Sequence, residues 1–180
     1  MTKEQLYQEG LNYISLFCKV NNIKMPKIIC YNDNGYYCCG CYDDNKKIIK
    51  IYLKSCANEI NNPGYSWSHR HYFVDREPCG VICHEFGHYL HDILTNSKLV
   101  LPKENKITSY EPDFYERFAE TIKLFILNPS LLKEYDQQRY KVLTQKLKLI
   151  PIINDDWETV MNKNNMNIKF ILATKRKLKK

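Results

Sequence analysis

Residues 84–88 read His84-Glu85-Phe86-Gly87-His88, which is an H-E-x-x-H pattern. Side chains four residues apart on a helix project from one face, about one turn apart, so the two imidazoles could bind a single Zn²⁺. Glu85 would then lie beside the ion, where a carboxylate can take a proton from a water molecule. The pattern therefore predicts metal-assisted hydrolysis, provided that this segment is helical.

The residues around the pattern favour a helix. Apolar residues recur at three- and four-residue spacings, as they do on the buried face of a helix. They are Val81, Ile82, Phe86, Tyr89, Leu90, Ile93 and Leu94. Pro78 and Gly80 mark the expected beginning of the helix, and Asn96-Ser97 mark its expected end.

A zinc site that also binds water needs a third protein ligand. His91 is one candidate, but in an unbroken helix it lies ~10 Å farther along the axis than His84. The chain also lacks the later histidine of the metzincin pattern. We therefore expect His91 to lie behind the ligands or at the surface.

Two carboxylates farther along the chain are better candidates. The segment 115–125 has the spacing of a second apolar helix, and it places Glu116 and Glu120 on one side. Two carboxylates on one side of a buried helix are costly unless a cation neutralises them. One could bind the ion while the other bonds a ligand imidazole. The alternative is a solvated face on which Arg117 and Lys123 pair with the acids.

Together, H-E-F-G-H and the string E-x-F-A-E at residues 116–120 resemble the gluzincin group of zinc peptidases. Within that group the chain is similar to the ImmA/IrrE peptidases, to the catalytic domain of anthrax lethal factor and to small phage and viral metallopeptidases. The run from Phe118 to Asn128-Pro129 matches an F-A-E-x-x-x-L-F-x-x-N-P pattern of the phage-type chains. The specific part of the resemblance covers residues 75–160.

The resemblance implies a role for each matching residue. His84 and His88 would be the first two zinc ligands, and Glu85 the general base. Glu116 would be the third ligand, and Glu120 the acid that orients a ligand histidine.

Related sites also carry a tyrosine, upstream of the third ligand, that stabilises the oxyanion. Tyr110 lies near that position, although its spacing is not identical, so Tyr115 and Tyr89 stay as alternatives. The implied cofactor is one Zn²⁺ ion, and the implied partner is a protein or peptide substrate.

The expected function is that of a zinc-dependent metalloendopeptidase acting on an intracellular protein. The alternative is a peptidase-derived binding or regulatory module, with a protein or nucleic-acid partner and a structural or vestigial metal site. The intact trio His84, Glu85 and His88 favours the enzyme, because a non-catalytic descendant has no need of the base. A DNA-associated protease of the Spartan type is disfavoured, since it would use a later histidine.

Length and composition suit a single α+β domain over residues 1–170, followed by a basic tail at 171–180. We expect a zincin-like fold, with a small antiparallel or mixed sheet of about three strands packed against the active-site helix and further C-terminal helices. The tail contributes much of the net charge of +7, so contact with nucleic acid is expected only through it. No apolar stretch is long enough to span a membrane, and residues 1–6 do not read as a signal peptide. These features predict a cytoplasmic protein, in its own cell or in a host.

The remaining segments predict the other elements. The apolar residues Leu6, Leu11, Ile14, Phe17 and Cys18 predict an amphipathic first helix that ends near Asn21-Asn22. A strand is expected over residues 26–31. Residues 35–42 and 46–53 should form a hairpin, in which Ile48–Leu53 could serve as an edge strand that aligns an extended peptide. A last long helix is expected after Ser130, which would cap it, and should reach about Leu149.

The eight cysteines lack the paired C-x-x-C spacing of a structural zinc site. Without a secretion signal, we expect them to be reduced and to act as small buried hydrophobic residues.

Overall fold

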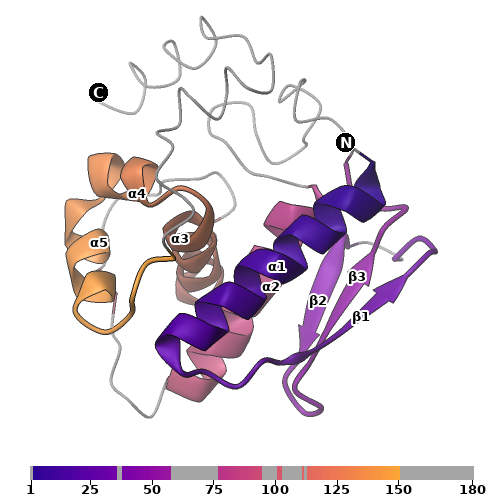
Figure 1. The fold of residues 1–180 in the computed structure, drawn as a ribbon, viewed down its shortest axis with the longest axis horizontal. Coiled ribbons are helices and arrows are strands. Elements are labelled where there is room, and N and C mark those ends of the chain that lie inside the picture. Colours follow the sequence, from indigo (N-terminus) through magenta and orange to yellow (C-terminus); the bar gives the residue numbers. More distant parts are fainter. Residues whose placement is uncertain are drawn as a thin grey trace, which may run out of the picture.

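The computed structural model describes residues 2–35, 38–57, 77–94, 101–102, 111 and 113–150, and Figure 1 shows how the elements are arranged. In chain order these are α1 (Lys3–Asn21), β1 (Lys27–Tyr31), β2 (Gly40–Asp43), β3 (Ile48–Tyr52), α2 (Pro78–Leu94), α3 (Phe114–Leu127), α4 (Pro129–Tyr135) and α5 (Gln137–Thr144). The described residues thus form an α+β fold with one small sheet, as the sequence predicts. Tyr110 and the basic tail 171–180 lie outside the described residues.

Helix α1 begins where side chains bond the open backbone N–H groups. Thr2 Oγ1 accepts a hydrogen bond from the backbone N–H of Gln5 at 3.2 Å, and Gln5 Oε1 accepts one from the Thr2 N–H at 2.8 Å. This reciprocal capping satisfies donors that a helix start otherwise leaves open. The helix stops before Asn22, whose left-handed φ of 52° turns the chain toward β1. The predicted first helix is confirmed.

The three strands form a mixed sheet in the order β1-β3-β2. β1 runs parallel to β3, and β2 runs antiparallel to it across the turn at residues 44–47. Alternate residues of β3 face the core, so Ile49 and Ile51 are fully buried. The predicted hairpin forms, although its first strand begins at Gly40 and not at Gly35.

The sequence-based role for the strand at 48–53 is wrong. β3 pairs with β1 on one side and with β2 on the other, so its backbone groups are already used in the sheet. It therefore cannot align an extended peptide as an edge strand, and among the described strands the outer ones are β1 and β2. The prediction failed because β3 also pairs in parallel with β1, a strand from earlier in the chain. Hairpin signals are local and do not reveal this long-range contact.

Helix α2 carries the H-E-x-x-H pattern, as predicted. It begins at Pro78, a residue suited to the first turn because it has no N–H to leave unpaired. Every residue from Pro78 to Leu90 is buried. The helix packs against α1 and α3 and against strands β2 and β3, so it lies centrally among the described elements (Figure 1).

Aromatic side chains join three helices in the core. Phe17 of α1 meets Phe86 of α2 edge-on, with ring centroids 5.8 Å apart. The same ring meets Phe125 of α3 edge-on at 6.3 Å. All three rings are at most 1% exposed, and edge-to-face pairs of this kind add to the free energy of apolar burial. Phe86 therefore has a packing role inside the H-E-x-x-H pattern.

The predicted last long helix is two helices. Asn128 caps the end of α3, and α4 begins at Pro129, not after a Ser130 cap. Asp136 then interrupts the helix, because its side chain accepts a hydrogen bond from the Arg139 backbone N–H at 2.9 Å and caps α5. This second start lets the chain turn and bury Arg139.

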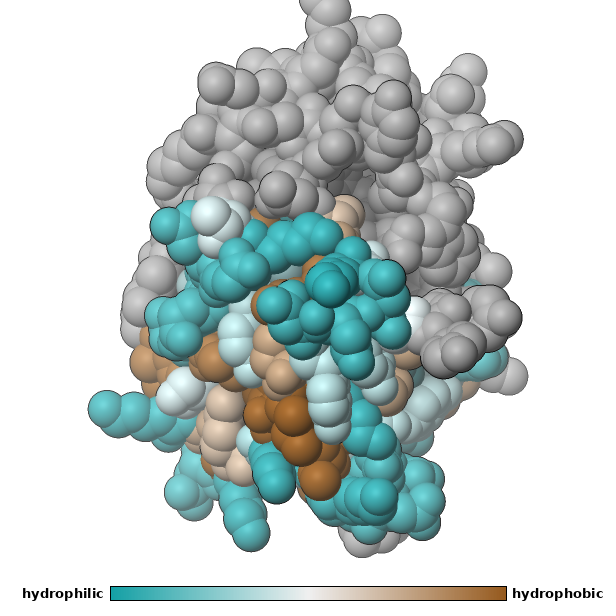
Figure 2. All heavy atoms as spheres, turned by 90° about the vertical axis from the view of Figure 1, so that its right-hand side faces the viewer, coloured by the Kyte–Doolittle hydropathy of each residue, from teal (hydrophilic) through white to brown (hydrophobic). Residues whose placement is uncertain are grey.

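Three further features of the described residues concern membrane spans, the surface and the cysteines. No helix in the described part of the chain is both long and apolar enough to cross a membrane. Seen from the right-hand side of Figure 1, apolar residues gather between hydrophilic ones (Figure 2). All eight cysteines lie within the described residues, and each is a thiol and not half of a disulfide. Five of them are buried as expected, whereas Cys30 and Cys41 are partly buried and Cys38 is exposed.

Candidate metal centre

Helices α2 and α3 face each other through matching i, i+4 pairs. His84 and His88 project from α2, and Glu116 and Glu120 project from α3. Asp113 fixes the start of α3, because its side chain accepts a hydrogen bond from the Glu116 backbone N–H at 2.9 Å. The local helix periodicity thus sets each pair, and the packing of the two helices brings the pairs together.

Three potential ligand atoms form a small triangle. His84 Nε2 lies 3.0 Å from Glu116 Oε2, and His88 Nε2 lies 3.5 Å from the same oxygen. The two Nε2 atoms are 3.1 Å apart. Among the described residues, this is the group of histidine, cysteine and acidic side chains close enough to bind a metal ion.

The triangle has the dimensions of a tetrahedral metal site. Ligand atoms at ~2.0–2.1 Å from a tetrahedral Zn²⁺ lie about 3.3 Å apart, which the three observed separations match. Two imidazole nitrogens that face each other at 3.1 Å need a proton or a cation between them, because two lone pairs would repel. The donor set therefore fits one divalent ion.

A buried ion pair lies behind the first histidine. Glu120 Oε1 is 2.7 Å from His84 Nδ1, and Glu120 Oε2 accepts a hydrogen bond from Lys123 Nζ at 2.8 Å. Glu120 and Lys123 are 1% and 2% exposed. Since His84 Nδ1 is engaged by a carboxylate, the ring presents Nε2 to the triangle, which is the arrangement that orients metal-bound histidines.

The carboxylates control the charge of the centre. Burial by itself would lower the pKa of His84, but hydrogen bonds to Glu116 and Glu120 raise it to about 9. Burial would raise the pKa of Glu116, but its bonds to His84 and His88 lower it to about 2. Burial opposes ionisation of Glu120 as well, yet Lys123 and His84 lower its pKa to about 2. Without a metal, a proton on His84 takes the place of the cation.

Glu85 lies beside the triangle. It is 8% exposed, and burial raises the pKa of its carboxyl, while the electrostatic influence of His84 and His88 lowers it. A carboxylate whose pKa is raised binds a proton more readily, which is what a general base near neutral pH requires.

An aromatic cluster covers the second histidine. The Tyr115 ring stacks on the His88 ring at 4.2 Å between centroids and is 39% exposed. His91 does not join the donor triangle; its ring contacts Phe114, Tyr115 and Phe118 edge-on. Burial and nearby His88 lower the pKa of His91. Tyr115 is thus the described tyrosine whose ring touches a histidine of the triangle.

The structure brings together most of the residues that the sequence singles out. His84, His88 and Glu116 form the triangle, and Glu120 bonds His84 from behind. Tyr110, the expected oxyanion donor, lies outside the described residues, and the hydroxyl of its rival Tyr89 bonds the Lys24 carbonyl at 2.9 Å, away from the site.

Sequence reasoning missed Lys123, which it considered only as a partner for acids on a solvated face. The signal was present, because Lys123 is three residues after Glu120 in a helix whose neighbouring residues are apolar. A lysine between Ile122 and Leu124 is either exposed or paired, and a buried Glu120 is its natural partner.

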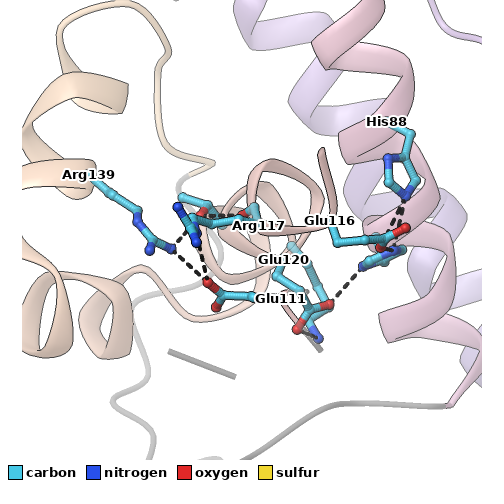
Figure 3. Close-up of polar contacts among 9 residues, drawn as sticks. His88, Glu111, Glu116, Arg117, Glu120 and Arg139 are labelled. Carbon is cyan, nitrogen blue, oxygen red and sulfur yellow. Dashed lines mark hydrogen bonds and ion pairs between the residues drawn. The ribbon is translucent and has the colours of Figure 1, made fainter. Parts of the chain in front are cut away.

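A second polar network lies on the other side of α3 (Figure 3). Arg139 is fully buried, and its guanidinium lies 2.7 Å from Asp136 and 3.4 Å from Glu111, and donates to Thr121 Oγ1 at 3.0 Å. Arg117 Nε also lies 3.6 Å from Glu111. α3 therefore presents Glu116 and Glu120 to α2, while its opposite side is tied to α5 and to the segment before the helix.

Comparison of the chain with protein-family models, with curated proteins and with solved structures finds no match.

Proposed function

We propose that this protein is a zinc-dependent metallopeptidase that hydrolyses peptide bonds of a protein or peptide substrate. The observation that carries the proposal is the triangle of His84, His88 and Glu116 ligand atoms with the Glu85 carboxylate beside it. Two imidazoles and one carboxylate are a donor set that suits zinc, and three protein ligands leave a coordination position open.

Each protein group has a part in the reaction. His84, His88 and Glu116 would hold the ion, and Glu120 with Lys123 would keep His84 oriented toward it. A zinc ion at this position would acidify water and polarise the scissile carbonyl. Glu85 would take the proton from the attacking water as the C–O bond forms and the carbonyl electron pair moves onto its oxygen. It would then deliver that proton to the amine nitrogen as the carbonyl re-forms and the C–N bond breaks.

A tyrosine hydroxyl would complete the site by donating to the carbonyl oxygen as negative charge develops on it. Tyr115 is a candidate because its ring stacks on His88 and is partly open to solvent. Tyr110 is also a candidate, because the resemblance to related peptidases implies a tyrosine near that position in the sequence.

The intact base distinguishes this proposal from a binding module with a structural metal. Metal binding requires only the triangle, whereas Glu85 contributes nothing to the donor set. Burying the Glu85 carboxylate beside the metal donors costs free energy of folding. A catalytic role for Glu85 would explain why the chain keeps it there, which favours the enzyme.

The test is peptide hydrolysis by the zinc-loaded protein with a randomised peptide library, read by mass spectrometry. Glu85→Gln should bind zinc as the wild type does and lose hydrolysis by about a thousandfold or more, because it cannot accept the proton. Glu9→Gln, which changes a carboxylate on α1 remote from the triangle, should cleave normally. Cleavage by Glu85→Gln at the wild-type rate, or no cleavage by the zinc-loaded wild type, would contradict the proposal.

A further inference from the structure

Strand β2 forms one wall of the Glu85 side chain. A Cβ atom added at Gly40 would lie 3.0 Å from Glu85 Cγ, 2.7 Å from Val81 Cγ1 and 3.1 Å from Ile51 Cδ1. The strand backbone therefore rests directly against the carbon stem of Glu85. The position of β2 on α2 decides where the Glu85 carboxylate can point.

The register of the hairpin turns one edge of β2 toward Glu85. Cys41 and Asp43 lie opposite Lys50 and Ile48, and the Tyr52 N–H donates to the Cys39 carbonyl at 2.8 Å. In an antiparallel pair the backbone groups alternate in direction, so those of Gly40 and Tyr42 point away from β3.

Glu85, the proposed general base, lies beside the edge of β2 that faces away from β3. The Tyr42 backbone N–H lies on this outward edge and faces the Glu85 carboxylate, and Gly40 of the same strand packs against the Glu85 side chain. This backbone donor comes from the same residue whose side chain is anchored to α2.

The Tyr42 side chain is anchored at two points of α2. Its hydroxyl donates to Asp92 Oδ2 at 2.6 Å, and its ring meets the Tyr89 ring edge-on at 6.0 Å. Lys47, at the end of the β2–β3 turn, bonds the same Asp92 oxygen. We call these contacts of Tyr42 and Lys47 with Asp92 the anchor. Asp92 lies two turns beyond Glu85 on α2, so Tyr42 reaches from Glu85 at its backbone to Asp92 at its hydroxyl.

The polar end of the anchor lies at the edge of the core, against which the Tyr42 ring packs. The Lys47 and Asp92 side chains are 52% and 29% exposed, so loss of one hydroxyl there should change stability by no more than a surface interaction does. A loss of activity in such a variant would thus reflect displacement of Glu85 and not unfolding of the protein.

We propose that Tyr42 is a positioning residue for Glu85. Its hydroxyl bond to Asp92 holds β2 against α2, so that Gly40 confines the Glu85 side chain and the Tyr42 backbone N–H faces the carboxylate. This inference rests on the proposed function for its catalytic meaning, but the structural link between Tyr42 and Glu85 can be measured without any substrate.

The first test compares Tyr42→Phe with Tyr13→Phe. Tyr13 is a matched control, since its hydroxyl also bonds a carboxylate (Glu9, 2.8 Å) but lies on α1. In Tyr42→Phe we expect kcat to fall about tenfold, because a small displacement of a catalytic group is costly, while the zinc dissociation constant stays unchanged. Asp92→Ala, which removes the acceptor, should reproduce this loss, and Tyr13→Phe should leave kcat unchanged.

The second test reads the strand itself by hydrogen exchange of the zinc-loaded protein. The Tyr42 amide should exchange about tenfold faster in Glu85→Ala and in Tyr42→Phe, because its acceptor is lost or displaced. The Cys41 and Asp43 amides, which face β3, should exchange at wild-type rates.

The outcomes separate the two proposals. A wild type that cleaves no peptide, but whose Tyr42 amide responds to Glu85→Ala, contradicts the proposed function and supports the structural link. An active wild type with equal kcat in Tyr42→Phe and Tyr13→Phe overturns the positioning role. Loss of zinc or of the fold in Tyr42→Phe at the assay temperature also overturns it. So does a Tyr42 amide that exchanges at the wild-type rate in Glu85→Ala.

Discussion

Gly87 of α2 lies against the backbone of Ala119 in α3. A Cβ atom at position 87 would stand 2.5 Å from Ala119 Cα and 2.8 Å from the Ala119 carbonyl oxygen. Gly87 immediately precedes His88, and Ala119 immediately precedes Glu120. The two small residues let the helices approach until imidazoles and carboxylates meet, so this contact sets the size of the donor triangle.

Gly87→Ala should therefore damage the centre without removing any ligand. The contact atoms belong to the backbone of α3 and cannot rotate away, so the helices must separate. We expect a loss of about 1–3 kcal/mol in the free energy of unfolding and weaker zinc binding, measured by denaturant titration and by competition with a chelator. Gly80→Ala, in the first turn of the same helix, is the comparison variant. Wild-type zinc affinity in Gly87→Ala would show that the helix approach does not determine the triangle.

Glu116→Ala should abolish tight metal binding. Glu116 Oε2 is the only oxygen of the triangle within the described residues, and it lies 3.0 and 3.5 Å from the two histidine nitrogens. We expect the zinc dissociation constant to rise by more than about a hundredfold, as measured by metal analysis after dialysis against a chelator. Glu9→Ala removes a helix carboxylate elsewhere and should keep zinc. Stoichiometric zinc in Glu116→Ala would place the third ligand elsewhere.

Zinc binding should release about one proton near pH 7.5. The pKa of His84 is raised to about 9 in the metal-free fold, so His84 is protonated there and must lose its proton to bind a cation. Affinity should consequently rise with pH until about 9. Calorimetry in buffers of different ionisation enthalpy measures the proton count, and a count near zero would contradict the expectation.

The same proton affects the stability of the metal-free protein in a defined direction. Because the pKa is raised above the ordinary 6.5, the contribution of His84 to folding is complete below pH 6.5 and is lost as the pH rises through about 9. Thermal unfolding of the zinc-free protein should show this decline, and His84→Gln should not.

Lys123→Met should destabilise the fold more than a surface substitution does. It would leave the Glu120 carboxylate, 1% exposed, without its cationic partner at 2.8 Å. Breaking a buried ion pair in this way costs about 3–5 kcal/mol, which denaturant unfolding would detect. Lys146→Met removes an exposed lysine and is the control. Equal unfolding free energies for the two variants would mean that the Lys123–Glu120 pair contributes nothing.

Local patterns in the sequence were enough to predict the helices that carry the donors. The spacing from Val81 to Leu94 predicts a buried α2, and the apolar spacing of residues 115–125 predicts α3, because helix periodicity depends on residues a few positions apart. The chemistry that we propose for His84, Glu85 and His88 was inferred from their types and spacing within a single helix.

Long-range contacts decided what local patterns could not. Whether Glu116 or His91 meets the two histidines depends on how α3 crosses α2, and on the Gly87–Ala119 contact that permits the crossing. The central place of β3 depends on parallel pairing with a strand from earlier in the chain. The burial of Lys123 is also a product of packing.

The sequence by itself determined which side chains could do hydrolytic chemistry and which short segments would be helical, since both depend on near neighbours along the chain. Only the tertiary structure decided which carboxylate completes the triangle, which lysine neutralises the other one, and which strand lies against Glu85. Those choices are made by atoms that are far apart in sequence and become neighbours only when the helices and the sheet pack around a shared core.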